Sequence, residues 1–145
     1  MTSRASPQPR DAYRRFMRIS TRWMDNDVYG HVNNVVYYSF FDTAVNGTLI
    51  ELGALDIQES AVIGLVVETQ CNYFAPVEFP TAIEAGVRVE HLGRSSVRYR
   101  VGLFAEGAPE TAAAGHFVHV YVDRETRRPV GALPPALRAA LDRLS

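Results

Sequence analysis

The chain has 145 residues, of which 47% are hydrophobic and 21% are charged, the proportions of an ordinary globular domain. Its net charge of −1 lacks the basic excess of a nucleic-acid-binding surface, so no nucleic-acid partner is expected. No apolar run reaches the roughly 18 residues that a membrane-spanning helix needs, and the single cysteine, Cys71, cannot form an internal disulfide. We therefore expect a cytoplasmic protein without a membrane partner.

The first half of the chain predicts a tail, a strand and a helix. Residues 1–12 contain two prolines among arginines, and we expect them to form a flexible N-terminal tail ahead of a single domain at residues 13–145. Apolar and polar side chains alternate over residues 16–23, as in a half-buried strand. Over residues 34–52 the apolar positions recur at steps of three and four, which predicts a long helix that stops at Gly53.

The second half of the chain is richer in β-branched residues and turn signals. It predicts four strands, at residues 62–74, 83–92, 96–104 and 117–122. Consecutive strands joined by turns imply an antiparallel meander, and Pro134-Pro135 begins a short C-terminal helix. One strand, one long helix and four strands predict an α+β fold, with a five-stranded antiparallel sheet curved around the helix.

The loop before the long helix concentrates the polar chemistry of the chain. It contains Asp25, Asp27 and His31, and Gly30 allows a tight turn into the helix. A carboxylate can attack an activated acyl group or take a proton from water. Backbone N–H groups at the helix start, around Asn34, have no preceding intrahelical acceptor and can polarise a carbonyl. The loop therefore predicts acyl chemistry.

Structural roles for the same residues remain open from the sequence. Asp25 or Asp27 could cap a turn, and Asn33 or Asn34 could be the N-cap of the helix. A calcium-binding EF-hand is excluded because a tyrosine and a valine occupy two of its ligand positions. No standard metal-site spacing is present, and no metal or cofactor is expected.

The motif resembles that of a known enzyme family. Residues 25–34 read Asp-Asn-Asp-Val-Tyr-Gly-His-Val-Asn-Asn, and Tyr37 and the sequence Phe-Asp-Thr-Ala at 41–44 follow. This pattern resembles the signature of the 4-hydroxybenzoyl-CoA thioesterase family, and the order of elements agrees from about residue 13 to residue 122. The resemblance implies a single-domain hot-dog fold that hydrolyses acyl-CoA thioesters. The Gly-His-Val-Asn-Asn version differs from the type enzyme, so thioester hydrolysis is better supported than 4-hydroxybenzoyl specificity.

The resemblance also assigns roles by position. The second aspartate of the family's pair is catalytic, which points to Asp27, and the carbonyl-polarising backbone N–H seven residues later falls on Asn34. The family's active site lies at a dimer interface. It therefore implies a homodimer or homotetramer in which a second chain contributes to the acyl pocket.

Other residues are expected to contact the substrate. His31 could orient Asp27 or contact the acyl carbonyl, or it could hold the turn. Tyr37 belongs to an aromatic stretch near the site. The turn at Arg94-Ser95-Ser96 could bind a CoA phosphate through the guanidinium and backbone amides, as in enzymes resembling this one.

The expected function is hydrolysis of an acyl-CoA to a free acid and CoA. Two alternatives remain: a thioesterase that acts on acyl-carrier protein, and a hot-dog protein that binds acyl-CoA without hydrolysing it. The sequence does not indicate which acyl chain is preferred.

Overall fold

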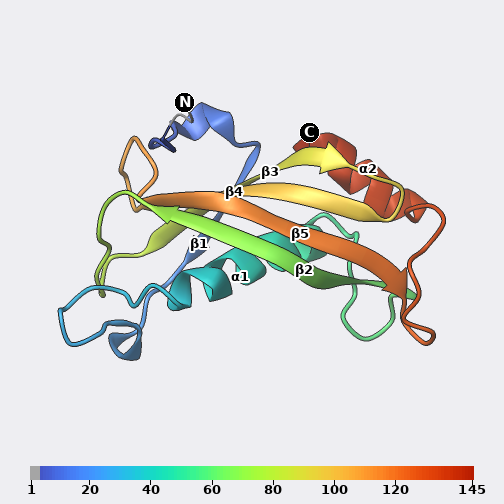
Figure 1. The fold of residues 1–145 in the computed structure, drawn as a ribbon, viewed down its shortest axis with the longest axis horizontal. Coiled ribbons are helices and arrows are strands. Elements are labelled where there is room, and N and C mark those ends of the chain that lie inside the picture. The colour runs from blue at the N-terminus through green and yellow to red at the C-terminus, as the bar shows by residue number, and fades with distance from the viewer. Residues whose placement is uncertain (1–3) are drawn as a thin grey trace.

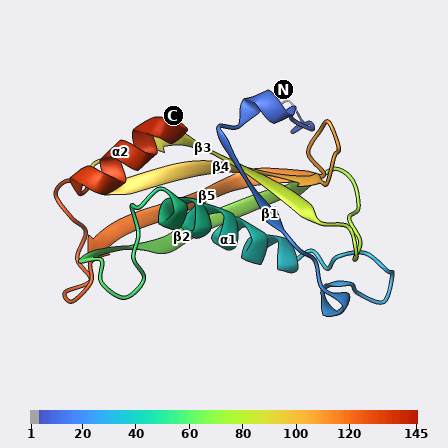
Figure 2. The same ribbon diagram turned by 180° about the vertical axis from the view of Figure 1, so that it is seen from behind.

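In the computed structural model, which describes residues 4–145, a five-stranded sheet curves around the sixteen-residue helix α1 (Val36–Glu51) (Figures 1 and 2). The strands are β1 (Arg15–Ile19), β2 (Val62–Tyr73), β3 (Ile83–Leu92), β4 (Ser96–Ala105) and β5 (Ala113–Asp123). A second helix, α2 (Pro135–Leu144), ends the chain. No helix in the described residues is long and apolar enough to cross a membrane. This arrangement confirms the predicted α+β hot-dog fold.

The strands are antiparallel throughout and follow the order β1-β3-β4-β5-β2. The meander β3-β4-β5 forms the middle of the sheet, and β1 adds to one side of it. The strand β2 follows α1 in sequence and pairs with β5 over its whole length, from Val62 opposite Asp123 to Tyr73 opposite Ala113. The second long edge of β2 is therefore unpaired in the single chain.

The core lies between α1 and the concave face of the sheet, as Figure 2 shows with α1 in front of the strands. Phe41, Ala44 and Val45 of α1 are fully buried, because the helical spacing places them on the side that faces the sheet. Alternate residues of β4, including Tyr99 and Val101, face the same core. Burial of each large apolar side chain contributes roughly 1.5–3 kcal/mol, so this contact fixes the position of α1.

Two strand boundaries differ by more than one residue from the sequence-based prediction. β5 begins at Ala113 instead of residue 117, because small residues with little strand preference still pair between β2 and β4. Gly115 is one of them, and a Cβ atom there would overlap the backbone of Gln70. β1 ends at Ile19 instead of residue 23, because Ile19 pairs with Ile83, the first residue of β3.

Part of the segment predicted to be a flexible tail is bonded to the rest of the protein. The backbone N–H of Gln8 donates to Thr111 Oγ1 at 2.9 Å, and the Thr111 N–H donates back to the Gln8 carbonyl at 3.0 Å. Arg10 forms an ion pair with Glu84 at 2.7 Å. Residues 8–12 therefore pack against the domain that was expected to begin at residue 13.

Candidate active site

The motif loop, residues 23–34, connects β1 to α1 and rests on the chain between β2 and β3. It is the blue loop that precedes α1 in Figure 1. The N–H of buried Val32 donates to the Val77 carbonyl at 2.7 Å. The side-chain carbonyl of Asn26 accepts from the Phe79 N–H at 3.1 Å. These two anchors hold the loop at one end of the sheet.

Asp25 is a structural residue of the loop. Its side chain is 2% exposed, and its carboxylate accepts a hydrogen bond from the Arg22 N–H at 2.8 Å and two from the Arg22 guanidinium at 3.0 and 2.8 Å. The carbonyl of Asp25 accepts from the Asn33 N–H at 2.8 Å. Asp25 thus closes the base of the loop, and its carboxylate is committed to Arg22.

Asp27 occupies a more open position on a tight turn. Its N–H donates to the His31 carbonyl at 2.8 Å, and its own carbonyl accepts from the Gly30 N–H at 3.0 Å. Gly30 has a φ of 82°, a conformation that favours glycine. One carboxylate oxygen, Oδ1, accepts from the Tyr29 N–H at 2.8 Å, and the other accepts no hydrogen bond from residues 4–145. Asp27 is therefore held in place while one oxygen stays free.

Asn34 stands just before the first turn of α1. Its carbonyl accepts hydrogen bonds from the Tyr37 N–H at 3.3 Å and from the Tyr73 hydroxyl at 3.0 Å. Its N–H has no acceptor within the described part of the chain. The side chain of Asn33 accepts from the Val35 N–H at 3.1 Å, so Asn33 closes the turn before the helix. The N–H of Asn34 is therefore free to donate to the oxygen of a bound molecule.

An aromatic wall lies beside Asn34. Tyr37 is 3% exposed, and its ring meets that of Tyr73 edge-on with centroids 5.0 Å apart. Burial raises the pKa of Tyr37, and it raises the pKa of Cys71, in the same strand as Tyr73, to about 11. Cys71 is thus a neutral thiol at neutral pH and a poor nucleophile.

The loop carries two separate surface hollows. Asp27 and Tyr29 line one of about 710 Å³, whereas His31, Asn34 and Tyr37 line another of about 310 Å³. The imidazole of His31 is exposed and makes no hydrogen bond to residues 4–145, so the backbone of His31 holds the turn. The structure therefore brings His31, Asn34 and Tyr37 together, and it places Asp27 on the adjacent hollow of the same loop.

The turn at Arg94-Ser95-Ser96 is remote from this loop within one chain. It connects the end of β3 to the start of β4, and the Ser95 carbonyl accepts from the Tyr121 N–H at 2.6 Å. The motif loop lies against residues 77–79, which precede the start of β3. A ten-residue strand separates the two ends, roughly 30 Å, so a single chain does not unite Arg94 with Asp27.

Sequence reasoning missed the residues that position the loop. Tyr73 and Val77 bond to it through a hydroxyl and a backbone carbonyl, and Asn26 within the loop accepts from the Phe79 N–H through its side-chain carbonyl. Tyr73 was visible as an aromatic at the end of a predicted strand, but nothing in its spacing indicates that it reaches the Asn34 carbonyl. Across residues 4–145 no three of His, Cys, Asp and Glu cluster closely enough to hold a metal ion.

A family model described as the thioesterase-like superfamily matches residues 21–141. The chain is 28% identical over 124 residues to the L-carnitine dehydrogenase/betainyl-CoA thioesterase of Agrobacterium fabrum. That match covers 85% of this chain and 25% of the relative, so the chain spans about a quarter of that protein's length.

Solved structures extend the comparison. The PA5185 protein of Pseudomonas aeruginosa strain PAO1 is 60% identical, with a TM-score of 0.93 and 97% of both chains covered. A DHNA-CoA thioesterase from Staphylococcus aureus has a TM-score of 0.72 at 22% identity, covering 80% of this chain and 78% of its own, a similarity of fold alone. The matched regions include the motif loop, α1 and most of the sheet.

Proposed function

This chain belongs to the thioesterase-like superfamily, a family of thioester hydrolases, and from that premise we propose that it hydrolyses an acyl-CoA thioester to a free acid and CoA. The observation that supports this proposal most directly is that one anchored loop carries both a free carboxylate oxygen on Asp27 and an unbonded N–H on Asn34. The first can supply a base or nucleophile, and the second can stabilise an oxyanion.

The two groups divide the chemistry between them. The free oxygen of Asp27 either takes a proton from the attacking water or attacks the thioester carbonyl carbon itself. In both routes the carbonyl oxygen gains negative charge, which the Asn34 N–H at the start of α1 stabilises. The carbon–sulfur bond then breaks and CoA leaves as its thiolate. On the general-base route the free acid is formed at this point, and the thiolate takes up the proton that Asp27 removed from water. On the nucleophilic route an acyl–Asp27 anhydride remains, and water hydrolyses it to the free acid and restores the carboxylate, which leaves a proton for the thiolate. His31 and Tyr37 share the Asn34 hollow and would contact the acyl end of the substrate.

A second copy of the chain is part of the proposal. The free edge of β2 exposes Leu65, Val66 and Val67, which are 37%, 46% and 60% exposed. An unpaired strand edge with exposed apolar side chains is a template for pairing with another strand. A homodimer or homotetramer built on this edge would complete the open hollows of the motif loop with residues of the partner.

A CoA ester is the proposed substrate because a curated relative carries the name of a CoA thioesterase, betainyl-CoA thioesterase. The turn at Arg94-Ser95-Ser96 would bind a CoA phosphate at the interface, where a partner's turn can approach the motif loop. Arg94 is exposed and therefore available to a phosphate. Thiol release from matched acyl-CoA and acyl-carrier-protein substrates separates this proposal from an acyl-carrier-protein thioesterase.

The substitution Asp27→Asn tests the catalytic assignment. Asparagine keeps an oxygen for the Tyr29 N–H but removes the base, so hydrolysis of acyl-CoA should fall about a hundredfold to ten-thousandfold. A thiol-release assay across short, long, branched and aromatic acyl-CoAs measures the loss and finds the best substrate. Asp142→Asn, which removes an exposed carboxylate on α2, is the matched control and should hydrolyse at the wild-type rate.

Two results would contradict the proposal. Turnover at the wild-type rate by a folded Asp27→Asn variant would remove Asp27 from the chemistry. Calorimetric binding of CoA esters by the wild type without release of free thiol would identify a binding protein instead of an enzyme.

A further inference from the structure

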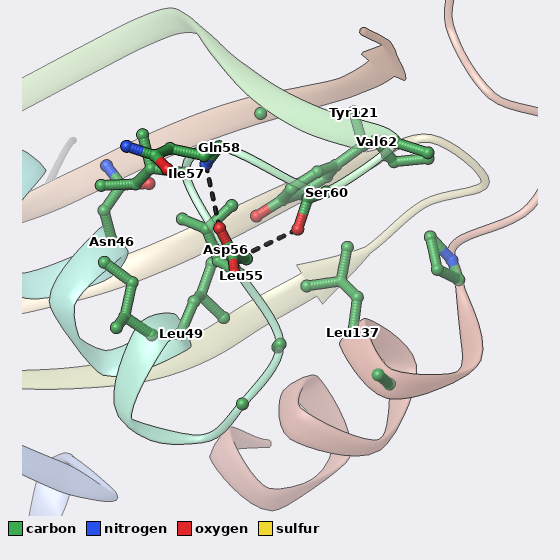
Figure 3. Close-up of a pocket in the computed structure, with 17 residues that line it drawn as sticks. Asn46, Leu49, Leu55, Asp56, Ile57, Gln58, Ser60, Val62, Tyr121 and Leu137 are labelled. Atoms are coloured by element: carbon green, nitrogen blue, oxygen red, sulfur yellow. Dashed lines mark hydrogen bonds between the residues drawn. The ribbon is translucent and has the colours of Figure 1, made fainter.

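A pocket lies at the far end of α1 from the motif loop. It has a volume of about 790 Å³ and is bounded by the C-terminal end of α1, the chain that leads into β2, and the start of α2 (Figure 3). Leu49, Leu55, Val62 and Leu137 give it an apolar lining. Its size and mainly apolar wall are those of a small-molecule site.

The charges around this pocket limit what it can hold. No arginine or histidine is among the residues that line it, so an anion would find no positive partner there. The one charged lining residue, Asp56, already uses Oδ1 to accept hydrogen bonds from the N–H groups of Gln58 and Glu59, at 3.0 and 3.1 Å. Burial of an unpaired charge is costly, so the pocket disfavours anions.

A buried polar network reaches the pocket wall through Tyr121. The hydroxyl oxygens of Tyr99 and Tyr121 are 2.6 Å apart, and His119 Nδ1 is 3.1 Å from the Tyr121 oxygen. All three side chains are at most 3% exposed to solvent. Tyr121 alone of the three lines the pocket, where Figure 3 draws its ring extending from β5 between Ser60 and Val62.

The direction of these hydrogen bonds follows from the need to satisfy the buried Tyr99 hydroxyl. Burial lowers the pKa of His119 to about 4, so the imidazole is neutral at neutral pH and Nδ1 can accept. If Tyr99 donates to Tyr121 and Tyr121 donates to His119, every hydroxyl proton has an acceptor. In the reverse order the Tyr99 proton has none among the described residues, which is unfavourable in a buried site.

This order of hydrogen bonds leaves the Tyr121 hydroxyl oxygen able to accept one more hydrogen bond. This oxygen accepts one hydrogen bond and donates another, and a second lone pair remains. A group that approaches Tyr121 from the pocket must therefore be a hydrogen-bond donor. We propose that the pocket binds a neutral, largely apolar molecule with one hydroxyl group, such as an aryl or aliphatic alcohol, whose proton the Tyr121 oxygen accepts. This site is additional to the proposed hydrolysis at the motif loop.

Three naphthalene derivatives test the proposal by calorimetry on the full chain at neutral pH. 2-Naphthol can donate a hydrogen bond, 2-methoxynaphthalene can only accept one, and 2-naphthoate is an anion. We expect 2-naphthol to bind about fivefold more tightly than 2-methoxynaphthalene, the effect of one net hydrogen bond. 2-Naphthoate should bind more weakly than either, because its charge would be buried without a partner.

Two matched variants locate the binding site. Ala136 and Ala139 are both exposed on α2, but only Ala136 lines the pocket. Ala136→Trp fills the pocket and should weaken binding of 2-naphthol at least about tenfold, whereas Ala139→Trp should leave it unchanged. Tyr121→Phe removes the accepting oxygen, so 2-naphthol and 2-methoxynaphthalene should bind this variant with about equal affinity.

Three outcomes would overturn the proposal. They are wild-type binding of 2-naphthol by Ala136→Trp, a preference for 2-naphthol that survives in Tyr121→Phe, and binding of 2-naphthoate as tight as that of 2-naphthol. The tryptophan pair stays decisive if Tyr121→Phe fails to fold, because both substitutions lie on the exposed side of α2.

Discussion

Asp25 and Asp27 are two residues apart and identical in chemistry, and their surroundings separate their roles. Asp25 is buried, and its carboxylate forms an ion pair with the Arg22 guanidinium at 2.8 Å. Asp27 is half-buried and shares one oxygen with the Tyr29 N–H. A group that already has its partners stabilises the loop, and a group with a free oxygen can react. Neighbouring residues thus decide which carboxylate is available for chemistry.

His119, a single buried residue, leads to a prediction of how the stability of the protein depends on pH. Burial lowers its pKa from 6.5 to about 4 in the folded protein, so between these values the unfolded chain binds a proton that the folded chain does not. Stability is unaffected by this group above pH 6.5 and falls as the pH drops from 6.5 towards 4, by up to about 3 kcal/mol. Urea unfolding of the wild type and of His119→Leu at a series of pH values measures the effect.

The comparison is between slopes and not absolute stabilities, because His119→Leu also removes the hydrogen bond to Tyr121 at every pH. The wild type should lose more stability than His119→Leu over the acidic range. His91→Gln, which replaces an exposed histidine, should follow the wild type. Parallel profiles for the wild type and His119→Leu would contradict a neutral, buried His119.

At the scale of elements, the spacing of apolar residues predicts those helices and strands whose positions are determined by burial of their own side chains. The helix α1 was predicted because Phe41, Ala44 and Val45 must face one sheet, and the structure buries them fully. The start of β5 was missed because Ala113 and Gly115 have no strand preference of their own. Their pairing depends on β2 and β4, which a local pattern does not contain.

The candidate site was predictable to a similar degree. The aspartate, the glycine turn and the helix start are consecutive in sequence, so the loop could be identified as a unit. The separate hollows of Asp27 and Asn34, and the distance of Arg94 from both, depend on how the loop rests on residues 77–79. That contact joins segments about fifty residues apart in sequence, so the residue pattern of the loop alone does not predict it.

Gly115 gives a prediction on strand pairing. In Gly115→Ala the added methyl group would overlap the Gln70 backbone, so β2 and β5 must separate locally. Overpacking of this kind should lower the free energy of unfolding by at least about 2 kcal/mol. Urea unfolding measures it, with Gly131→Ala as the control, since that site has open space around it and should change by less than about 0.5 kcal/mol. Equal stability of the two variants would mean that the strands are farther apart than described.

At the scale of the whole molecule, the sheet ends in an unpaired strand. The free edge of β2 exposes Val66 beside the irregular pairing between Val66 and Glu68. Charged side chains, and lysine in particular, keep the edge strands of natural sheets from pairing with other chains. β2 carries one charged side chain, Glu68, which already pairs with His116 at 2.9 Å, so this long edge is expected to be covered in an assembled protein.

The substitution Val66→Lys should break the proposed assembly. A charge on the β2 edge would have to be buried against the partner, so the assembly should dissociate into monomers and hydrolysis should fall with it. Light scattering at matched concentrations measures the mass. Ala139→Lys places the same charge on the exposed face of α2 and should leave the mass unchanged. A Val66→Lys protein of wild-type mass would move the interface elsewhere.

The hydroxyl of Tyr73, the last residue of β2, holds the carbonyl of Asn34 at 3.0 Å. The same strand thus carries both the open edge of the sheet and the bond that steadies the peptide before α1. A chain that docks on β2 would restrain Tyr73, and through it Asn34, whose N–H we propose to polarise the substrate carbonyl. The rate of hydrolysis per chain would then rise with protein concentration and decline on dilution. A rate measured at a single concentration would therefore depend on the degree of association as well as on the chemical step.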